Sequence, residues 1–351
     1  MRDLDTILHL KNNPITSFIR SMNISSSPTP YSSVVGQLTF SLEGLDPQEV
    51  SVIEVINADN GTTLGRIRCT GLAERKINVA PYFRRLFELG MVPSTATSVL
   101  VFPYSLFNCA IRCGDTQSPA VPIVMSAPAF APIAERTLLS ELPLHRTIAP
   151  GEFDILTTIS PDGMIEAEFT LSGTEGQSSS FSISSTEAVR MLGIGVDYDS
   201  LKQRAGYDLA GIEVSLLAGG QSVAVVEYEV VTRGRETCRL VWANRYGAAE
   251  LFTFEPVVSI RSVADRPVDR EASSDVVASE TRTLTLDSGI CPRQLIEALS
   301  GILSSPFVYR LAGGKAHDVR VCNSECTIAE AGKPSKITVQ ISTTEKAAAT
   351  I

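Results

Sequence analysis

Histidine is the first residue type to weigh for chemistry, because the chain has only His9, His145 and His317. Asp318 follows His317, and a carboxylate can orient an imidazole for proton transfer. Adjacent residues of a strand point to opposite faces, so these two side chains would not contact each other there. His145 follows Leu142-Pro143-Leu144 and is expected in a loop. The sequence therefore predicts no catalytic histidine.

The sequence contains two closely spaced cysteine pairs, Cys109-x-x-x-Cys113 and Cys322-x-x-x-Cys326. Structural zinc sites usually combine two such ligand pairs around one ion. On a strand, residues i and i+4 share a face but lie about 13 Å apart, too far to ligate one zinc ion without a turn between them. Cys109 also stands among apolar residues, where a thiol is often just a small buried side chain. We therefore predict no metal site and no cofactor.

Motifs of nucleophilic and phosphate chemistry are absent from the sequence. It contains neither a Gly-x-Ser-x-Gly elbow nor a Gly-x-x-x-x-Gly-Lys-Ser/Thr loop. Asp197-Tyr198-Asp199 is too short for a calcium loop, which needs about six oxygen ligands. The two carboxylates of a glycoside hydrolase are brought together by folding, so no fixed sequence spacing identifies them. With 39 acidic residues in the chain, some pair always fits, and the acidic residues alone do not indicate hydrolysis. We expect no enzymatic activity, and a glycan hydrolase stays as an alternative.

Composition narrows the class of protein further. The 351 residues carry a net charge of −9 and are 44% hydrophobic and 20% charged, with a mean hydropathy of +0.13. No stretch approaches the ~18 apolar residues of a membrane span, and no Lys/Arg-rich block indicates nucleic acid as the main partner. We expect no secretory signal at residues 1–5 and, from the odd count of seven cysteines, reduced thiols.

The elements that would position any site are mainly strands. Leu38, Phe40 and Leu42 alternate with polar residues, as do residues 165–171, and Asn60-Gly61 is typical of a tight hairpin turn. Helical spacing occurs at 82–87 behind a proline and at 292–303. The predicted fold class is mainly β, with two or three antiparallel β-sandwich-like domains and short amphipathic helices.

Composition shifts divide the chain into five predicted parts. Ser25–Pro30 and four prolines between 119 and 132 mark the first boundaries, and the polar stretch 263–279 marks the last. The N-terminal part reads either as a mobile tail or as a strap that orders on a neighbouring subunit. The parts are an N-terminal arm (1–30), a β domain with a short helix (31–117), a proline-rich linker (118–135), a central β-sandwich (136–262) and a C-terminal α+β segment (263–351).

The chain's single tryptophan lies in a predicted strand–turn–strand unit. Leu240, Trp242, Phe252 and Phe254 can line one sheet face across the turn that Asn244 to Gly247 form. Cross-strand aromatic pairs of this kind contribute about 0.2–1 kcal/mol each. We therefore predict a core role for Trp242; an exposed tryptophan that stacks on a sugar is the functional alternative.

The run Arg239–Phe254 also resembles a signature of structural proteins from phages and prophages of Bacteroidetes-type bacteria. The matching residues are Trp242, Asn244 and Gly247, in the pattern Trp-x-Asn-x-x-Gly, followed by Phe252 and Phe254 alternating with a polar residue. Residues 77–84 and 146–152 resemble two further steps of such proteins. The resemblance implies a virion component without enzymatic activity, of the tail or baseplate, made in the bacterial host cytoplasm.

Three functions are therefore weighed. The first is a phage-like assembly protein that forms a homo-oligomer and binds other virion proteins, because high apolar content without a membrane span suits a chain that buries surface against partners. The second is a host-surface or glycan-binding adhesin module, which predicts aromatic residues on exposed loops. The third is the glycan hydrolase, which predicts a cleft with two carboxylates.

Overall fold

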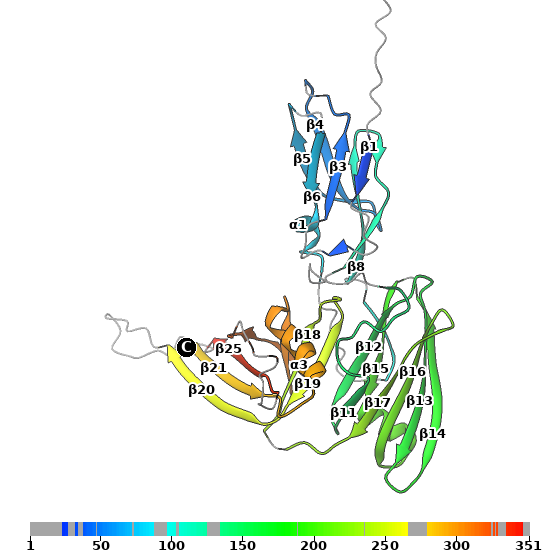
Figure 1. Ribbon diagram of the computed structural model, residues 1–351, viewed down its shortest axis with the longest axis vertical. Helices are drawn as coiled ribbons and strands as arrows, with labels where there is room; N and C mark the ends of the chain where they lie inside the picture. Colours follow the sequence, from blue (N-terminus) through cyan, green and yellow to red (C-terminus); the bar gives the residue numbers. More distant parts are fainter. Residues whose placement is uncertain are drawn as a thin grey trace, which may run out of the picture.

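The computed structural model confirms a mainly β fold built from several antiparallel sheets (Figure 1). Two pairings, of β2 with β10 and of β11 with β17, are parallel. The strands form three units, each with two sheets. The structure describes residues 23–26, 32–33, 38–46, 48–71, 74–87, 97–102, 105–124, 134–187, 189–234, 236–265, 279–323, 326, 328 and 335–346.

The N-terminal unit is a pair of sheets around one apolar core. Alternation places Phe40, Leu42, Ile53 and Ile111 inside it, each fully buried. Gly61 closes the hairpin between β4 and β5 with a φ of +71°, a backbone conformation that glycine adopts without strain. One sheet is β1 (Asn23–Ser26), β3 (Thr39–Glu43) and β6 (Glu74–Asn78); the other is β2 (Ser32–Ser33), β10 (Val121–Val124), β8 (Leu106–Cys113), β4 (Ser51–Asn57) and β5 (Thr62–Cys69), with β9 (Thr116–Gln117) on β8.

Two predictions about the flanks of this unit are wrong in part. Within the expected arm, Asn23–Ser26 forms β1, because Ile24 lies opposite Leu42 of β3 and is buried. Within the expected linker, Val121–Val124 forms β10 despite Pro122, because β8 contributes the pairing partners and Ile123 is buried. Residues 1–22 of the arm and 125–133 of the linker lie outside the described residues.

The central unit confirms the predicted strand at 165–171, which forms part of β13 with strictly alternating burial. Its five-stranded sheet has the order β11 (His145–Ile148), β17 (Gln221–Val230), β16 (Leu209–Ala218), β13 (Met164–Gly173) and β14 (Ser178–Thr186). Its second sheet is β12 (Phe153–Ile159), β15 (Met191–Asp197) and β7 (Val99–Val101). Because β7 pairs with β15, the first predicted domain contributes a strand to this unit.

The C-terminal unit includes strands that the sequence assigned to the central domain. β18 (Cys238–Ala243) pairs with β22 (Val308–Ala312), so the predicted boundary at 262 cuts through a sheet. One sheet is β19 (Ala249–Phe254), β18, β22 and β23 (Lys315–Asp318); the other is β20 (Val257–Asp265), β21 (Ser279–Asp287), β25 (Thr338–Lys346) and β24 (Arg320–Val321). β20 also runs through the first residues of the expected loop at 263–279.

The helices are short, as predicted. The expected helix at 292–303 is α3 (Arg293–Ser300), which continues as a 3₁₀ turn, η1 (Gly301–Ser304), and buries Ile296, Leu299 and Ile302. The expected helix at 82–87 is α1 (Ala80–Phe83), with Pro81 in its first turn. A third helix, α2 (Tyr198–Ala205), has no counterpart among the predicted elements.

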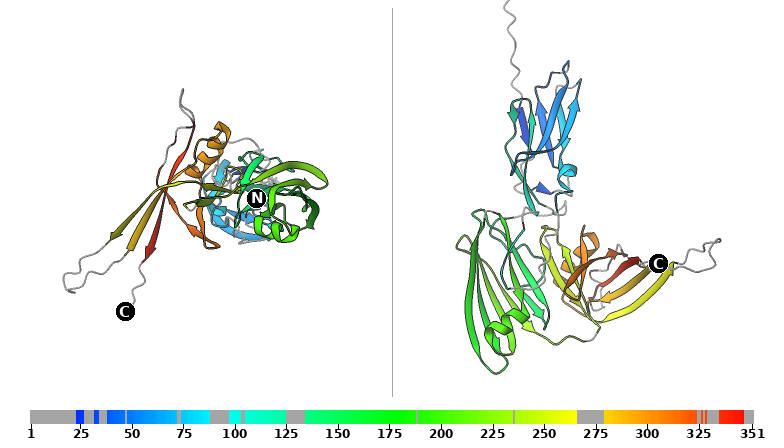
Figure 2. Two further views of the ribbon diagram at one scale, coloured as in Figure 1. Left: turned by 90° about the horizontal axis from the view of Figure 1, so that it is seen from below. Right: turned by 180° about the vertical axis from the view of Figure 1, so that it is seen from behind.

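Strand β18 joins two cores, because both of its faces are buried. Leu240 and Trp242 point into the core of the C-terminal unit, while Val241 and Ala243 belong to a second apolar cluster that also contains Ile155 and Ile159 of β12. By contrast, β20, β21 and β25 extend away from the rest of the molecule (Figures 1 and 2). β18 is therefore covered on both faces, whereas one sheet of its unit projects outward.

Candidate functional site

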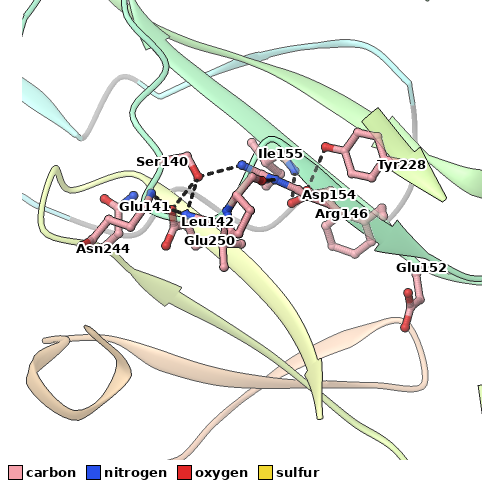
Figure 3. A network of polar contacts seen from close by, with 12 residues as sticks. Ser140, Glu141, Leu142, Arg146, Glu152, Asp154, Ile155, Tyr228, Asn244 and Glu250 are labelled. Atoms are coloured by element: carbon pink, nitrogen blue, oxygen red, sulfur yellow. Dashed lines mark hydrogen bonds and ion pairs between the residues drawn. The ribbon is translucent and has the colours of Figure 1, made fainter. Parts of the chain in front are cut away.

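A network of buried polar side chains lies where the central and C-terminal units meet (Figure 3). We call it the polar seam. Four of its charged members are buried, whereas the side chains of Glu141, Arg239 and Arg233 are 12%, 12% and 19% exposed. The polar seam consists of Ser140, Glu141, Arg146, Glu152, Asp154, Tyr228, Arg233, Arg239, Glu250 and Thr253.

Arg146 and Asp154 form the middle of the polar seam. Arg146 Nη1 donates to Asp154 Oδ2 at 2.8 Å, and the Tyr228 hydroxyl donates to the same oxygen at 2.9 Å. Arg146 also donates to the Pro143 carbonyl at 2.9 Å. Burial and the neighbouring Asp154 carboxylate raise the pKa of Tyr228 well above its usual value, so the phenol stays a donor. These groups form a closed, fully paired cluster.

Ser140 connects this cluster to Glu250 of β19. The Ser140 hydroxyl accepts from Arg146 Nη2 at 2.8 Å and donates to Glu250 Oε1 at 2.7 Å. The same oxygen accepts the backbone N–H of Glu141, and that of Leu142 at 3.3 Å. Glu250 therefore holds the chain segment after residue 139 against the C-terminal unit.

Glu141 and Glu250 are the pair of carboxylates that most resembles a hydrolase pair. Burial, and then the nearby Glu250, raise the pKa of Glu141, as is typical of a general acid. However, neither carboxylate lines either of the two clefts beside the polar seam. Arg245 also pairs with Glu141, at 3.1 Å, and its backbone N–H donates to the same carboxylate. The pair therefore acts as a structural contact between units.

Glu152 is shared by two arginines at the far end of the polar seam. Arg233 Nε lies 3.2 Å from Glu152 Oε1, and Arg239 Nη1 lies 3.5 Å from Oε2. The Thr253 hydroxyl donates to Glu152 Oε1 at 2.6 Å. Burial alone would raise the pKa of Glu152, but Arg239, Thr253 and Arg233 outweigh it and hold the pKa below its usual value.

Two open clefts adjoin these arginines, and both are lined by Arg233, Arg239 and Thr253. The first, with a cavity volume of about 130 Å³, has a polar side that includes Arg146 and an apolar side that includes Phe252. The second, with a cavity volume of about 340 Å³, is bordered by the Gly313-Gly314 turn and Lys315. We call the first the arginine cleft.

The residues of the predicted signature have mainly structural positions. Trp242 and Phe254 are fully buried, and Phe252 packs beside them with a ring-centroid distance of 5.0 Å to Phe254. Asn244 accepts the N–H groups of Tyr246 and Ala248 and so closes the turn, where Gly247 has a φ of +78°. A fully buried Trp242 cannot stack on a sugar, so that alternative is wrong.

The histidines do not gather near a nucleophile in the described part of the chain. His145 is the first residue of β11 rather than a loop residue, because β17 pairs with it, and its Nδ1 lies 3.3 Å from Glu227 Oε2. His317 and Asp318 are adjacent on the exposed strand β23. His317 Nε2 lies 3.4 Å from the Ala312 carbonyl oxygen. His9 lies outside the described residues.

The cysteines of the first pair are packing residues. Cys109 and Cys113 are both buried in the N-terminal core, and burial raises the pKa of Cys109 to about 12. Among the described residues, no three His, Cys, Asp or Glu side chains are close enough to hold a metal ion together. Within the same residues, no helix has both the length and the apolar content needed to cross a membrane.

An exposed apolar edge is the other candidate site. β20 is an edge strand of its sheet, with β21 as its partner on one side. Val258, Ile260 and Val263 on this strand are 58%, 66% and 51% exposed. Long edge strands with free backbone groups and exposed aliphatic residues are templates for pairing with another chain. We call these residues of β20 the open edge.

No protein-family model and no curated protein matches this chain. Among solved structures, a biofilm-associated protein BSP domain aligns over 59% of the chain at 10% identity with a TM-score of 0.17, and the chain spans only 29% of that protein's length. The chicken interferon gamma receptor alpha chain aligns over 58% of this chain and 94% of its own, at 10% identity and TM-score 0.15. The calcium-binding domain CBD12 of CALX1.1 aligns over 60% and 100%, at 8% identity and TM-score 0.18.

The polar seam was missed by the sequence reasoning, although one signal for it exists. Asp154, Arg239 and Glu250 each lie within or beside an apolar strand run, where a charged side chain needs a buried partner. The partners are distant in the chain: Tyr228 is 74 residues from Asp154, and Ser140 is 110 residues from Glu250. A charged residue in an apolar strand run therefore predicts that a buried partner exists, but the sequence does not show which residue that partner is.

Proposed function

We propose that the chain is a non-enzymatic virion assembly protein, of the tail or baseplate type, that joins to a second copy of itself through the open edge. The observation that carries the proposal is the exposure of Val258, Ile260 and Val263 on an edge strand. The resemblance of residues 239–254 to phage structural proteins supports the virion setting. The pairing of the polar seam's carboxylates supports the absence of hydrolysis.

A second copy is the occupant because β20 is complementary to itself. In an antiparallel pair centred on Ile260, each Ile260 lies opposite its counterpart, and Val257 lies opposite Val263. Arg261 then lies opposite Ser259, so no like charges meet, which would otherwise destabilise the pair. Such a contact repeats the same patch on both subunits, as a two-fold interface requires.

Light scattering on a sizing column at two protein concentrations tests the proposal. We expect an oligomer for the parent protein and a lower mass for Ile260→Lys, because a lysine on the edge blocks pairing. Met164→Lys is the matched control: Met164 is 47% exposed, but its backbone is paired on both sides, with Thr186 of β14 and with the Gly219 N–H. A monomer at both concentrations, or equal losses in the two variants, would contradict the proposal.

Cross-linking examines the register separately. An Ile260→Cys variant should form a disulfide with its own copy in oxidising buffer, because directly opposite residues have Cβ atoms about 4.5–5.5 Å apart. Ser262→Cys, which would lie opposite Val258, should cross-link no more than the parent protein. Equal yields from the two variants would rule out this register.

A further inference from the structure

The arginine cleft contains more positive than negative charge. Arg146 is matched by Asp154 in a one-to-one ion pair at 2.8 Å. Arg233 and Arg239, in contrast, share the single carboxylate of Glu152. One positive charge is therefore left without a direct partner in a largely buried position. Buried charges are normally paired, so this surplus favours a bound anion with a single charge.

The two arginines that share Glu152 also have hydrogen-bond donors without an acceptor in the described part of the chain. Arg239 Nη1 donates to Thr253 Oγ1 at 2.6 Å, and Nη2 donates to the Phe153 carbonyl, whereas the buried Nε has no partner. Arg233 donates through Nε and Nη2, to Glu152 and Thr147, and its Nη1 donates to no residue that the structure describes. A guanidinium edge is a planar fork that fits a carboxylate.

The opposite side of the arginine cleft is apolar. It is lined by Leu142, Leu251, Phe252 and Leu295, which come from three separate parts of the chain. The cavity between the two sides has a volume of about 130 Å³. A ligand that filled it would place a charged group on the arginines and an apolar group on these side chains.

We propose that the arginine cleft binds a monocarboxylate that carries a neighbouring apolar group. Arg233 holds the carboxylate through its free Nη1 group, the Arg239 guanidinium beside it adds positive charge, and Glu152 keeps both guanidinium planes in place. The leucines and Phe252 cover the apolar group. This proposal is independent of the open edge and of the assembly function.

Calorimetric titration with N-acetyl-leucine tests the site, with N-acetyl-leucinamide and acetate as matched ligands. We expect saturable binding of the acid, at least tenfold weaker binding of the amide, which lacks the charge, and weaker binding of acetate, which lacks the apolar group. Equal binding of acid and amide, or no binding of the acid, would overturn the proposal.

Variants place the binding in the cleft. Arg233→Gln should weaken binding of N-acetyl-leucine at least tenfold, while Arg66→Gln, an exposed arginine of the N-terminal unit paired with Glu54, should leave it unchanged. Leu295→Ser, on the apolar side, should weaken N-acetyl-leucine but not acetate, and it keeps the test valid if Arg233→Gln does not fold. Unchanged affinity in both cleft variants would refute the assignment.

The source of the carboxylate can be distinguished with one more ligand. An acetylated hexapeptide ending in leucine with a free carboxylate presents the same group as a chain terminus. Tighter binding of the peptide than of N-acetyl-leucine assigns the site to a protein C-terminus, and equal binding assigns it to a small acid. Binding by the amidated peptide that matched the free acid would contradict recognition of a carboxylate.

Discussion

At the scale of single residues, the Trp242 side chain fills part of the core of the C-terminal unit. It is fully buried, and its indole Nε1 has no hydrogen-bond partner among the described residues. Trp242→Ala should lower the free energy of unfolding by about 3–5 kcal/mol, because a large cavity remains. Trp242→Phe should lower it less, since no hydrogen bond of the indole is lost. Urea unfolding of both variants checks this order, and equal losses would contradict it.

Glu152 carries a pH dependence at the same scale. Its pKa is lower in the folded protein than its ordinary value near 4.5, so it stabilises the fold above that value and loses this effect as the pH falls through the folded pKa. Glu152→Gln should therefore lower the free energy of unfolding at pH 7, by about 3 kcal/mol for a broken buried pair. The difference from the parent should narrow below pH 4.

Glu141 is the matched control for this measurement, because its pKa is raised by burial and by Glu250. Its ionisation in the unfolded chain opposes folding, and this effect appears as the pH rises above the unfolded pKa. Glu141→Gln should thus show a pH dependence of opposite sign. Denaturant titrations between pH 3 and pH 7 distinguish the two, and parallel curves for both variants would count against the assigned shifts.

At the scale of elements, helix α2 depends on its first residue. The Asp197 side chain accepts the N–H of Ser200 at 2.8 Å, and Gly206 ends the helix with a φ of +77°. Asp197→Ala should destabilise the protein by about 1 kcal/mol, the usual effect of losing an N-cap. Asp199→Ala, two residues later in the first turn of the helix, should have a smaller effect. Thermal melting of both variants tests this, and a larger loss for Asp199→Ala would refute it.

At the scale of the whole molecule, the central and C-terminal units should unfold together. Glu250 holds the segment after residue 139, Glu152 pairs with Arg239 across the units, and β18 shares its two faces between two cores. We expect one calorimetric transition for these units, with equal calorimetric and van't Hoff enthalpies. Glu250→Gln should lower its midpoint. Two separate transitions in the parent protein would show that the polar seam does not couple the units.

Local patterns in the sequence determined much of the secondary structure. The alternation at 165–171, the hairpin at Asn60-Gly61 and the helix at 292–303 were all predictable, because the 2-residue and 3.6-residue periods depend on neighbouring positions alone. The strand–turn–strand unit around Trp242 was predictable for the same reason. The mainly β fold class follows from these elements.

Only the tertiary structure decided which strands lie side by side. Val99–Val101 joined the sheet of the central unit, and β18 joined that of the C-terminal unit, so the predicted boundaries were misplaced. The polar seam likewise depends on residues far apart in the chain, such as Arg239 and Glu152. Strand order and register follow from long-range burial and hydrogen bonding, whereas the period of a single strand contains no information about its neighbour.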